Sequence, residues 1–373
     1  MRTIINLIYN LLRGGYRRGV SLLRLFTIKS FVFSDSYYPE FKKRRKSRSE
    51  IFCMQLMHII KYGTPNSFFF AYGLDIKQFH QAKNYVDESV FMKRRNLLNR
   101  LGQPDSIVAL LRNKFLFGLI GNELGIPHPK EIGLIEQDEI YLFETRQTVS
   151  LKHYLTTIPG DAFIKELNGE CGNGVYHLEF GPGKQLSING EESRYIDLRE
   201  IIQNGKFILQ QRVQQIGALA DIYPQALNTI RIMTVFDRKN RQIEILPPVM
   251  RIGAHGNRVD NWAAGGLIVG IDVETGCLAK YGFYKPKIKV AKCTHHPDTH
   301  IQFEGYKIPF FDEAIALCKK YHSYFTEIHS IGWDVAITED GPCFIEGNDN
   351  WDTVLPQVCT RGFKTEFDKY FML

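Results

Sequence analysis

The residues best suited to chemistry lie at positions 331–350, in the stretch IGWDVAITEDGPCFIEGNDN. Two apolar runs flank a short loop that ends in glycine, which predicts a β-hairpin. If Thr338 pairs with Pro342 across the turn, Asp334 lies directly opposite Glu346. Like charges that face each other across paired strands repel, so we expect a cation between these two acids.

Asn348 adds a third oxygen ligand, because it follows Glu346 by two residues and strand side chains alternate between faces. Oxygen-only ligands favour Mg²⁺ or Mn²⁺, with phosphate oxygens filling the remaining positions. The alternative is a solvent-facing hairpin with two ordinary acids. The neighbouring Trp333 and Phe344 favour a buried sheet, where unpaired acids are costly. We therefore predict a divalent-metal site at Asp334, Glu346 and Asn348.

A second stretch, DAFIKELNGECGNGVYHLEF at 161–180, is suited to holding phosphate. An apolar strand delivers Lys165 to a loop that contains Gly169, Gly172 and Gly174. Backbone N–H groups in such a loop can surround phosphate oxygens, and a lysine adds positive charge. The stretch lacks the Gly-Lys-Ser/Thr sequence of a P-loop, so by itself it is equally compatible with a glycine-rich hairpin and an incidental lysine.

Further polar residues are candidates for contacts with a nucleotide base and with an acceptor. The strand KFILQQRVQQ at 206–215 could offer its backbone at Gln211 to Val213 to an adenine, although most such strands are only core. An arginine presents a planar fork to a carboxylate or a phosphoryl group, but each arginine here could instead form a salt bridge between lobes. The acceptor-side candidates are Arg231, Arg251, Asn228, Asn261, Gly265 and Gly266.

The charge distribution separates an N-terminal arm from the rest of the chain. The 373 residues have a net charge of +7, and residues 1–50 hold 12 Lys or Arg against 3 Asp or Glu. The remainder is therefore nearly neutral, which argues against a protein that binds nucleic acid over its whole surface. Seven scattered cysteines without a C-x-x-C pair fit reduced thiols and a cytoplasmic location.

Residues 1–26 place leucine and isoleucine at helical spacing with arginines opposite, although glycines weaken the middle of the helix. Such a helix can lie on an anionic membrane surface or dock on the protein's own body, and the sequence leaves both open. The basic run at 42–48 is either a solvated loop or a reinforcement of lipid contact. A lipid-binding arm over residues 1–50 would place the protein at the inner face of the membrane.

The remaining sequence predicts mixed helices and strands. Residues 51–104 are expected to be helical and irregular, and amphipathic helices are expected at 107–124, capped by Asp105 or Ser106, and at 312–330. Without regular βαβ alternation, this pattern predicts α+β lobes around antiparallel sheets. The predicted strands are 131–134, 140–143, 162–165, 207–212, 229–236, 243–247 and 267–273.

The order of these parts resembles the ATP-grasp superfamily, most closely the sugar-transfer associated ATP-grasp family. The similarity covers roughly residues 105–360. Its most specific part is the spacing of 12 and then 2 residues between Asp334, Glu346 and Asn348, which is close to the metal motif of carboxylate–amine ligases such as D-alanine ligase. The other stretches that carry it are NKFLFGLIGNELGIPHP, FIKELNGECGNGV, ALNTIRIMTVFD, VDNWAAGGLIVGID, and HPDTH with FEGYKIPFFDEA. His300 stands where this family pattern has glycine.

The resemblance implies an ATP-grasp fold of two α+β lobes that clasp ATP, with a helical N-terminal extension. The lobe with the phosphate loop would span 105–206 and the lobe with the metal site 207–373, after the arm (1–50) and a helical region (51–104). The lobes would hold ATP and Mg²⁺ or Mn²⁺ between them. The implied nucleotide contacts are Lys114, Lys165, Glu166, Gly169, Gly172, Asn173, Gly174, Gln211, Arg212, Val213 and Asp221.

The resemblance also implies an ADP-forming ligase that activates a carboxylate as an acyl phosphate and joins it to an amine or hydroxyl. The family name suggests a small-molecule or sugar-linked substrate in surface polysaccharide biosynthesis. One alternative is a small-molecule or sugar kinase of the same fold. Another is a nucleotide-binding scaffold without turnover, against which the complete set of metal ligands argues.

Overall fold

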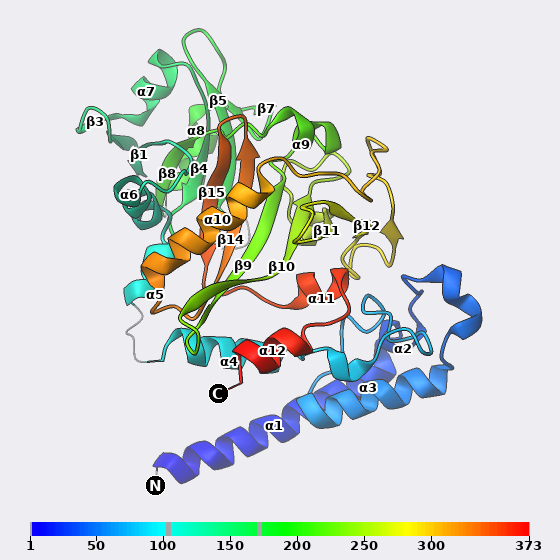
Figure 1. Cartoon of the computed structure of the whole chain (residues 1–373). Helices are drawn as coiled ribbons and strands as arrows, with labels where there is room; N and C mark the ends of the chain where they lie inside the picture. The colour runs from blue at the N-terminus through cyan, green and yellow to red at the C-terminus, as the bar shows by residue number, and fades with distance from the viewer. Residues whose placement is uncertain (1, 102–105, 170–173, 204, 373) are drawn as a thin grey trace.

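The computed structural model describes residues 2–101, 106–169, 174–203 and 205–372, with side chains from residue 15 onward except Ser106. Two antiparallel sheets form the centre of this described part, and helices cover them (Figure 1). Because every hydrophobic strand needs a covered face, the arrangement of the helices follows the burial pattern of the strands.

The first lobe is built on a sheet that has eight strands among the described residues, in the order β3-β2-β1-β8-β4-β5-β6-β7. Helices α7 (Leu151–Thr157) and α8 (Tyr195–Ile202) cover one face, where Ile164 and Leu209 are fully buried. The strands are β1 Glu131–Glu136, β2 Glu139–Leu142, β3 Gln147–Ser150, β4 Gly160–Glu166, β5 Val175–Phe180, β6 Ser187–Ile188, β7 Glu191–Glu192 and β8 Lys206–Gln211.

The second lobe is built on a sheet of seven described strands, in the order β13-β12-β11-β10-β9-β14-β15. Helix α10 (Phe311–His322) packs on one face, and α11 (Val354–Cys359) and the N-terminal region pack on the other (Figure 1). The strands are β9 Thr229–Asp237, β10 Gln242–Ile252, β11 Leu267–Ile271, β12 Leu278–Phe283, β13 Lys292–Cys293, β14 Ser330–Thr338 and β15 Gly341–Asn348.

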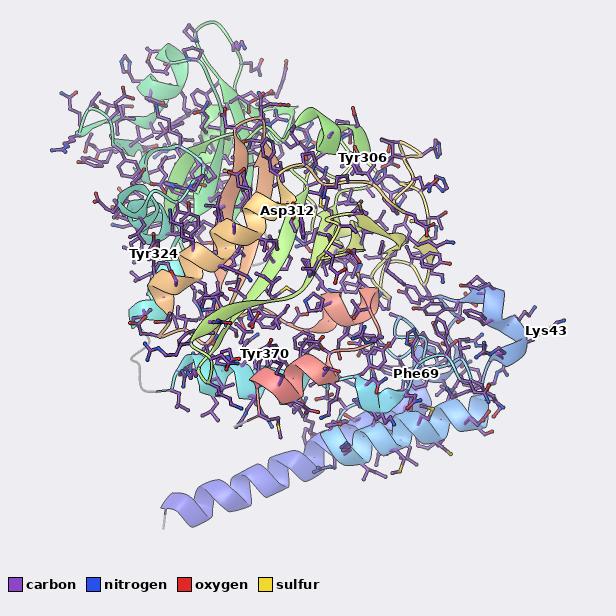
Figure 2. All side chains as sticks on the ribbon, in the orientation of Figure 1. Lys43, Phe69, Tyr306, Asp312, Tyr324 and Tyr370 are labelled. Carbon is purple, nitrogen blue, oxygen red and sulfur yellow. The ribbon has the colours of Figure 1, made fainter. Side chains whose placement is uncertain are left out.

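The N-terminal region is part of the second lobe's core. Tyr37 has no exposed surface and donates a hydrogen bond to the carbonyl of Tyr284 at 2.8 Å. Phe69 lies inside this region and Lys43 at its outer edge (Figure 2). The boundary at residue 50 therefore divides a single packed unit. Its helices are α1 Arg2–Thr27, α2 Ser30–Phe33, η1 Pro39–Arg44, α3 Arg48–Tyr62, η2 Ala82–Asn84 and α4 Glu88–Asn99.

Helix α1 is continuous through its glycines and is only partly docked. The Ser21 hydroxyl donates to the carbonyl of Gly63, just after α3, at 2.8 Å. Figure 1 shows the first half of α1 extending past the rest of the molecule. No helix in the described residues has the length and apolar character needed to cross a bilayer.

Three predicted elements differ in the structure. The helix predicted at 107–124 is two helices, α5 (Ser106–Arg112) and α6 (Lys114–Leu124), because the Asn113 side chain accepts hydrogen bonds from the first turn of α6 and caps it. The helix predicted at 312–330 ends at His322, followed by the short turn η4 (Ser323–Phe325) and then by β14. Strand β8, placed by the boundary at 206/207 in the second lobe, is a central strand of the first sheet.

Candidate active site

The hairpin of β14 and β15 brings Asp334 opposite Glu346, as predicted, but by a different register. The turn is shorter than expected, so Thr338 pairs with Gly341 instead of Pro342. A bulge beside Asp334 adds one residue to β15 and restores the opposition of the two acids. The bulge therefore aims both carboxyl groups at one face of the sheet.

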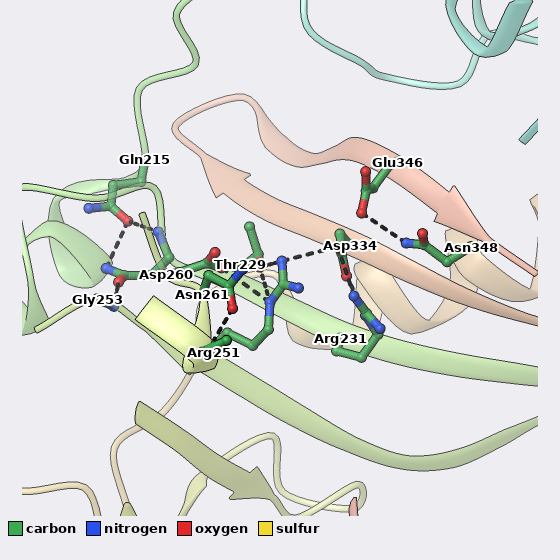
Figure 3. A network of polar contacts seen from close by, with 12 residues as sticks. Gln215, Thr229, Arg231, Arg251, Gly253, Asp260, Asn261, Asp334, Glu346 and Asn348 are labelled. Carbon is green, nitrogen blue, oxygen red and sulfur yellow. Dashed lines mark hydrogen bonds and ion pairs between the residues drawn. The ribbon is translucent and has the colours of Figure 1, made fainter. Parts of the chain in front are cut away.

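Two arginines neutralise Asp334 (Figure 3). Arg231 lies opposite Asp334 in β9 and holds it with two hydrogen bonds, of which that from Nη2 to Oδ2 is 3.0 Å. Arg251 in β10 reaches the same Oδ2 with its own Nη2 at 3.0 Å. Asp334 is only 2% exposed, and although burial opposes ionisation, the two guanidinium groups hold the pKa of Asp334 well below its ordinary value.

Glu346 has no such cationic clamp. Asn348 donates a hydrogen bond from Nδ2 to Glu346 Oε1 at 3.0 Å. Burial, the charge of Asp334 and a hydrogen bond to it raise the pKa of Glu346. Asp334, Glu346 and Asn348 therefore share one strand face, with Asp334 turned toward the arginines and Glu346 held by the side-chain amide of Asn348. An oxygen-rich site of this kind fits a hard divalent cation.

The two predicted phosphate lysines lie close to these acids. Lys114, the first residue of α6, donates from Nζ to the carbonyl of Gly169 at 2.6 Å. Lys165 stands near the end of β4, where burial, opposed by the charge of Glu346 and reinforced by that of Lys114, lowers its pKa to about 8. Lys165 therefore lies near a second ammonium group and near one of the two acids.

The glycine loop is described at its two ends. Gly174 has a φ of +68°, in the region that favours glycine, and its carbonyl accepts a hydrogen bond from the Glu166 amide at 2.9 Å. Glu166 itself is exposed. The predicted contacts Gly172 and Asn173 lie outside the described residues.

The backbone at 211–213 was predicted to contact an adenine, but two of its amides already donate hydrogen bonds within the protein. The amide of Gln211 donates to the carbonyl of Lys130 at 2.8 Å, and the amide of Arg212 donates to the carbonyl of Asp161 at 3.1 Å. The Arg212 guanidinium also pairs with the Asp161 carboxylate at 3.1 Å. These two amides are therefore not free to donate to a base.

Asn228, predicted to bind substrate, has an internal role instead. It has no exposed surface, and its Nδ2 donates to Gln215 Oε1 at 3.0 Å and to two backbone carbonyls. Its Oδ1 accepts from the amide of Gly253 at 3.1 Å. All its polar atoms are thus used to brace the start of β9 against neighbouring segments, which leaves none for a substrate.

Asn261 and the two glycines after it form a tight turn next to Arg251. Asn261 Oδ1 accepts from the Ala263 amide at 2.8 Å and caps the short helix η3 (Trp262–Ala264). Gly265 has a φ of +105°, and a Cβ on Gly266 would lie 2.8 Å from a backbone carbonyl oxygen. Both positions therefore require glycine to shape the turn.

Two predicted positions lie apart from this constellation. Asp221 is exposed on α9 (Gly217–Ile222), and among the described residues no contact joins it to the lysines or acids. His300 has a φ of +60°, in the left-handed region that few side chains adopt. This conformation explains why the related pattern has glycine at that position.

Sequence reasoning missed Asp260, which holds Arg251 from the side away from Asp334. Asp260 Oδ2 lies 3.3 Å from Arg251 Nε and accepts a hydrogen bond from the Thr229 hydroxyl, while Thr229 accepts from Arg251 Nη2 at 2.7 Å (Figure 3). Burial raises the pKa of Asp260, and Arg251 opposes that shift. The sequence signal that could have identified Asp260 was its position directly before Asn261, which was a predicted site residue.

Sequence reasoning also missed an ion pair between the end of the β14–β15 hairpin and the segment just before α6, the helix that begins at Lys114. Arg112, at the end of α5, grips Asp349 with Nε at 2.6 Å and Nη2 at 2.9 Å. Asp349 directly follows Asn348, and Arg112 lies two residues before Lys114. This bidentate pair therefore ties the end of the β14–β15 hairpin to the segment just before α6.

The sequence of this chain matches the model of a known family. The sequence model of the sugar-transfer associated ATP-grasp family matches residues 93–368. The chain belongs to this family. The two sheets are accordingly the two lobes of an ATP-grasp fold, and the N-terminal helices α1 to α3 lie before the matched region.

Solved structures of ATP-grasp enzymes are distantly similar to this ATP-grasp chain. Carboxyaminoimidazole ribonucleotide synthase from Aspergillus clavatus, complexed with ATP, has 10% identity and a TM-score of 0.35, over 65% of this chain and 46% of its own. D-alanyl-alanine synthetase A from Vibrio cholerae has 12% identity and a TM-score of 0.38, over 69% and 61%. An L-amino acid ligase from Bacillus licheniformis has 13% identity and a TM-score of 0.33, over 69% and 45%. The chain thus spans between 45% and 61% of these proteins, and no curated protein matches it significantly.

Proposed function

We propose that this ATP-grasp protein is an ATP- and Mg²⁺-dependent, ADP-forming ligase that joins a carboxylate to an amine or hydroxyl. The observation that carries the proposal is that Lys165 lies near both Lys114 and Glu346, and that Glu346 in turn faces Asp334 across the hairpin. Positive groups for phosphates and oxygen ligands for a cation thus meet at one place. The family's association with sugar transfer supports a sugar-linked substrate and a setting in surface polysaccharide synthesis.

The residues present fit a bound divalent ion. Glu346 is held beside a second acid with only an amide for support, and its raised pKa shows the cost of that proximity. Magnesium, when bound, supplies positive charge to both acids and to phosphate oxygens. Arg231 and Arg251, which bind Asp334, are the cationic groups that would meet a second anion.

The chain's own groups support a two-step reaction. Lys114 and Lys165 orient the triphosphate, and the arginines hold the substrate carboxylate. A carboxylate oxygen attacks the γ-phosphorus, the bond from that phosphorus to the bridging oxygen breaks, and ADP leaves. The amine or hydroxyl then attacks the acyl carbon, phosphate leaves, and the nucleophile loses a proton. The positioning and charge neutralisation provided by these residues account for the acceleration.

The test is a screen of the purified chain with ATP, Mg²⁺ and pairs of carboxylate and amine or hydroxyl compounds. A ligase produces ADP, phosphate and coupled product only when both partners are present. Glu346→Gln is expected to abolish turnover, whereas Asp340→Asn in the exposed turn of the same hairpin retains it. A stable phosphorylated product that needs no amine would show a kinase instead, and nucleotide binding without turnover across the screen would show a scaffold.

A further inference from the structure

The outer surface of α1 and α3 exposes an unusual group of large apolar side chains. We call it the α1–α3 face, and no described element covers it (Figure 1). Single exposed apolar residues are normal on proteins, but a cluster marks an interaction surface. The cluster consists of residues that are between 56% and 75% exposed, namely Tyr16, Leu23, Phe26, Met57 and Ile60.

Basic side chains accompany these apolar ones. Arg17 and Arg24 of α1 line one groove together with Met57, Ile60 and Lys61 of α3. The groove has a volume of 1240 Å³, larger than the roughly 300–1,000 Å³ of typical small-molecule pockets. The groove combines apolar walls with cationic groups from α1 and α3, and its far side, at the start of α4, adds the acids Asp87 and Glu88.

Exposed positive charge lies on α1 and α3 and on the segment between them. Residues 1–62 contain 13 Lys or Arg and 3 Asp or Glu. The basic run is partly used inside the protein, because Arg44 donates to the carbonyl of Lys77 at 2.7 Å, Lys46 donates to that of Ile76 at 2.9 Å, and Arg45 pairs with Asp75. Among the described side chains, the exposed basic residues of the two helices and their connection are Arg17, Arg18, Arg24, Lys29, Lys42, Lys43, Arg44, Arg48 and Lys61.

We propose that the α1–α3 face docks on an anionic phospholipid bilayer. The apolar side chains enter the boundary between headgroups and acyl chains, and the arginines and lysines contact lipid phosphates. Charge selects this occupant over a second copy of the chain, because two such faces would bring like charges together. The docked half of α1 and the whole of α3 are anchored to the protein's core, so the face is presented as a rigid unit.

The experiment is flotation of the full chain with vesicles of phosphatidylcholine, with and without phosphatidylglycerol, at low and high salt. We expect binding only to the anionic vesicles, and a loss at high salt, because the screening length falls from about 10 Å at 0.1 M to about 3 Å at 1 M. The double variant Met57→Asp/Ile60→Asp is expected to lower the affinity for vesicles about tenfold or more.

A matched control separates this surface from a general effect of added acid. Ile196→Asp changes an isoleucine with 43% exposure on α8 in the other lobe, and vesicle binding should be unchanged. Thermal melting of each variant verifies that it is folded. The proposal is overturned if the wild type does not bind anionic vesicles or if the double variant binds them as well as the wild type. It is also overturned if the double variant and the Ile196→Asp control lose binding equally. Self-association at this face without vesicle binding would also overturn it.

Discussion

At the scale of single residues, Asp334 and Glu346 face each other but have opposite surroundings. Asp334 is held by Arg231 and Arg251, so replacing it leaves two buried guanidinium groups without their shared partner. We expect Asp334→Asn to lower the free energy of unfolding by about 3–5 kcal/mol. Glu346→Gln removes an unneutralised charge and should leave stability nearly unchanged. Urea unfolding of both variants without divalent ions measures the difference, and equal losses would contradict it.

Lys165 should contribute to nucleotide affinity far more than to folding. A hydrogen bond from a charged donor to phosphate is worth roughly 1.5–3 kcal/mol, which corresponds to about ten- to a hundredfold in affinity. We expect Lys165→Met to weaken ATP binding by that factor in calorimetry. Lys184→Met, at an exposed position of the same lobe, is the control and should bind as the wild type does.

The pKa of Lys165 also predicts a pH dependence of binding. Burial lowers this pKa to about 8, so the free protein begins to lose the lysine's charge above that pH. A phosphate oxygen favours the charged form, and therefore ATP binding should take up protons at roughly pH 8.5 and weaken as the pH rises. Calorimetry in buffers of different ionisation enthalpy detects the uptake. Lys165→Arg does not titrate in this range, so it should bind without that uptake.

At the scale of elements, His322 links α10 to β9. Its Nδ1 is 2.7 Å from Thr234 Oγ1 and its Nε2 is 2.9 Å from the carbonyl oxygen of Ile328. Burial lowers the pKa of His322 from 6.5 to about 4. Between these values the unfolded chain binds more protons than the folded one, so stability present above pH 6.5 is lost as the pH falls toward 4.

This loss amounts to about 3 kcal/mol for a shift of that size. Urea midpoints at neutral and acidic pH measure it. His322→Gln should lower stability at neutral pH and flatten the acid dependence, whereas His153→Gln, at an exposed position of α7, should leave the dependence unchanged. An unchanged slope in the His322 variant would assign the acid sensitivity to other groups.

Local patterns predicted most elements but not the details set by tertiary contacts. Alternating apolar residues placed the site strands correctly, because their period follows from the buried face. The division of the helix at Asn113 depends on a side chain capping a backbone, and a polar residue in an apolar pattern does not by itself reveal that. The bulge beside Asp334 has no local signature, since it arises from how β14 pairs with both β9 and β15.

At the scale of the whole molecule, the N-terminal region behaves as two parts. Deleting residues 2–14 removes only the projecting part of α1 and should leave thermal melting cooperative. Deleting residues 1–50 removes Tyr37 and Val32 from the core shared with β11 and β12, so it should abolish cooperative melting. Scanning calorimetry of the two truncations distinguishes these outcomes, and a cooperative transition in the longer one would show that residues 30–50 are dispensable.

The candidate site was predictable in part, because the spacing of Asp334 and Glu346 about a short turn places the two acids opposite each other. The ties between its parts were not predictable, because they join segments far apart in the sequence. Arg112 and Asp349 are 237 residues apart, and Arg231 and Asp334 are 103 apart. Asn228 illustrates the opposite error. It was predicted to bind substrate because it is polar and close to the predicted site in the sequence, but its side-chain amide forms its hydrogen bonds within the protein.

The arginine clamp on Asp334 has a consequence for how the protein matures in a cell. A site whose acids depended on a metal would leave the new chain unfinished until an ion arrived. For Asp334 the counter-charge is part of the polypeptide, so the metal requirement of the proposed ligase would apply to its activity and not to the folding of its chain. A chelator should accordingly abolish the activity of the protein without unfolding it. Adding the ion back should restore the activity at once, with no delay for refolding.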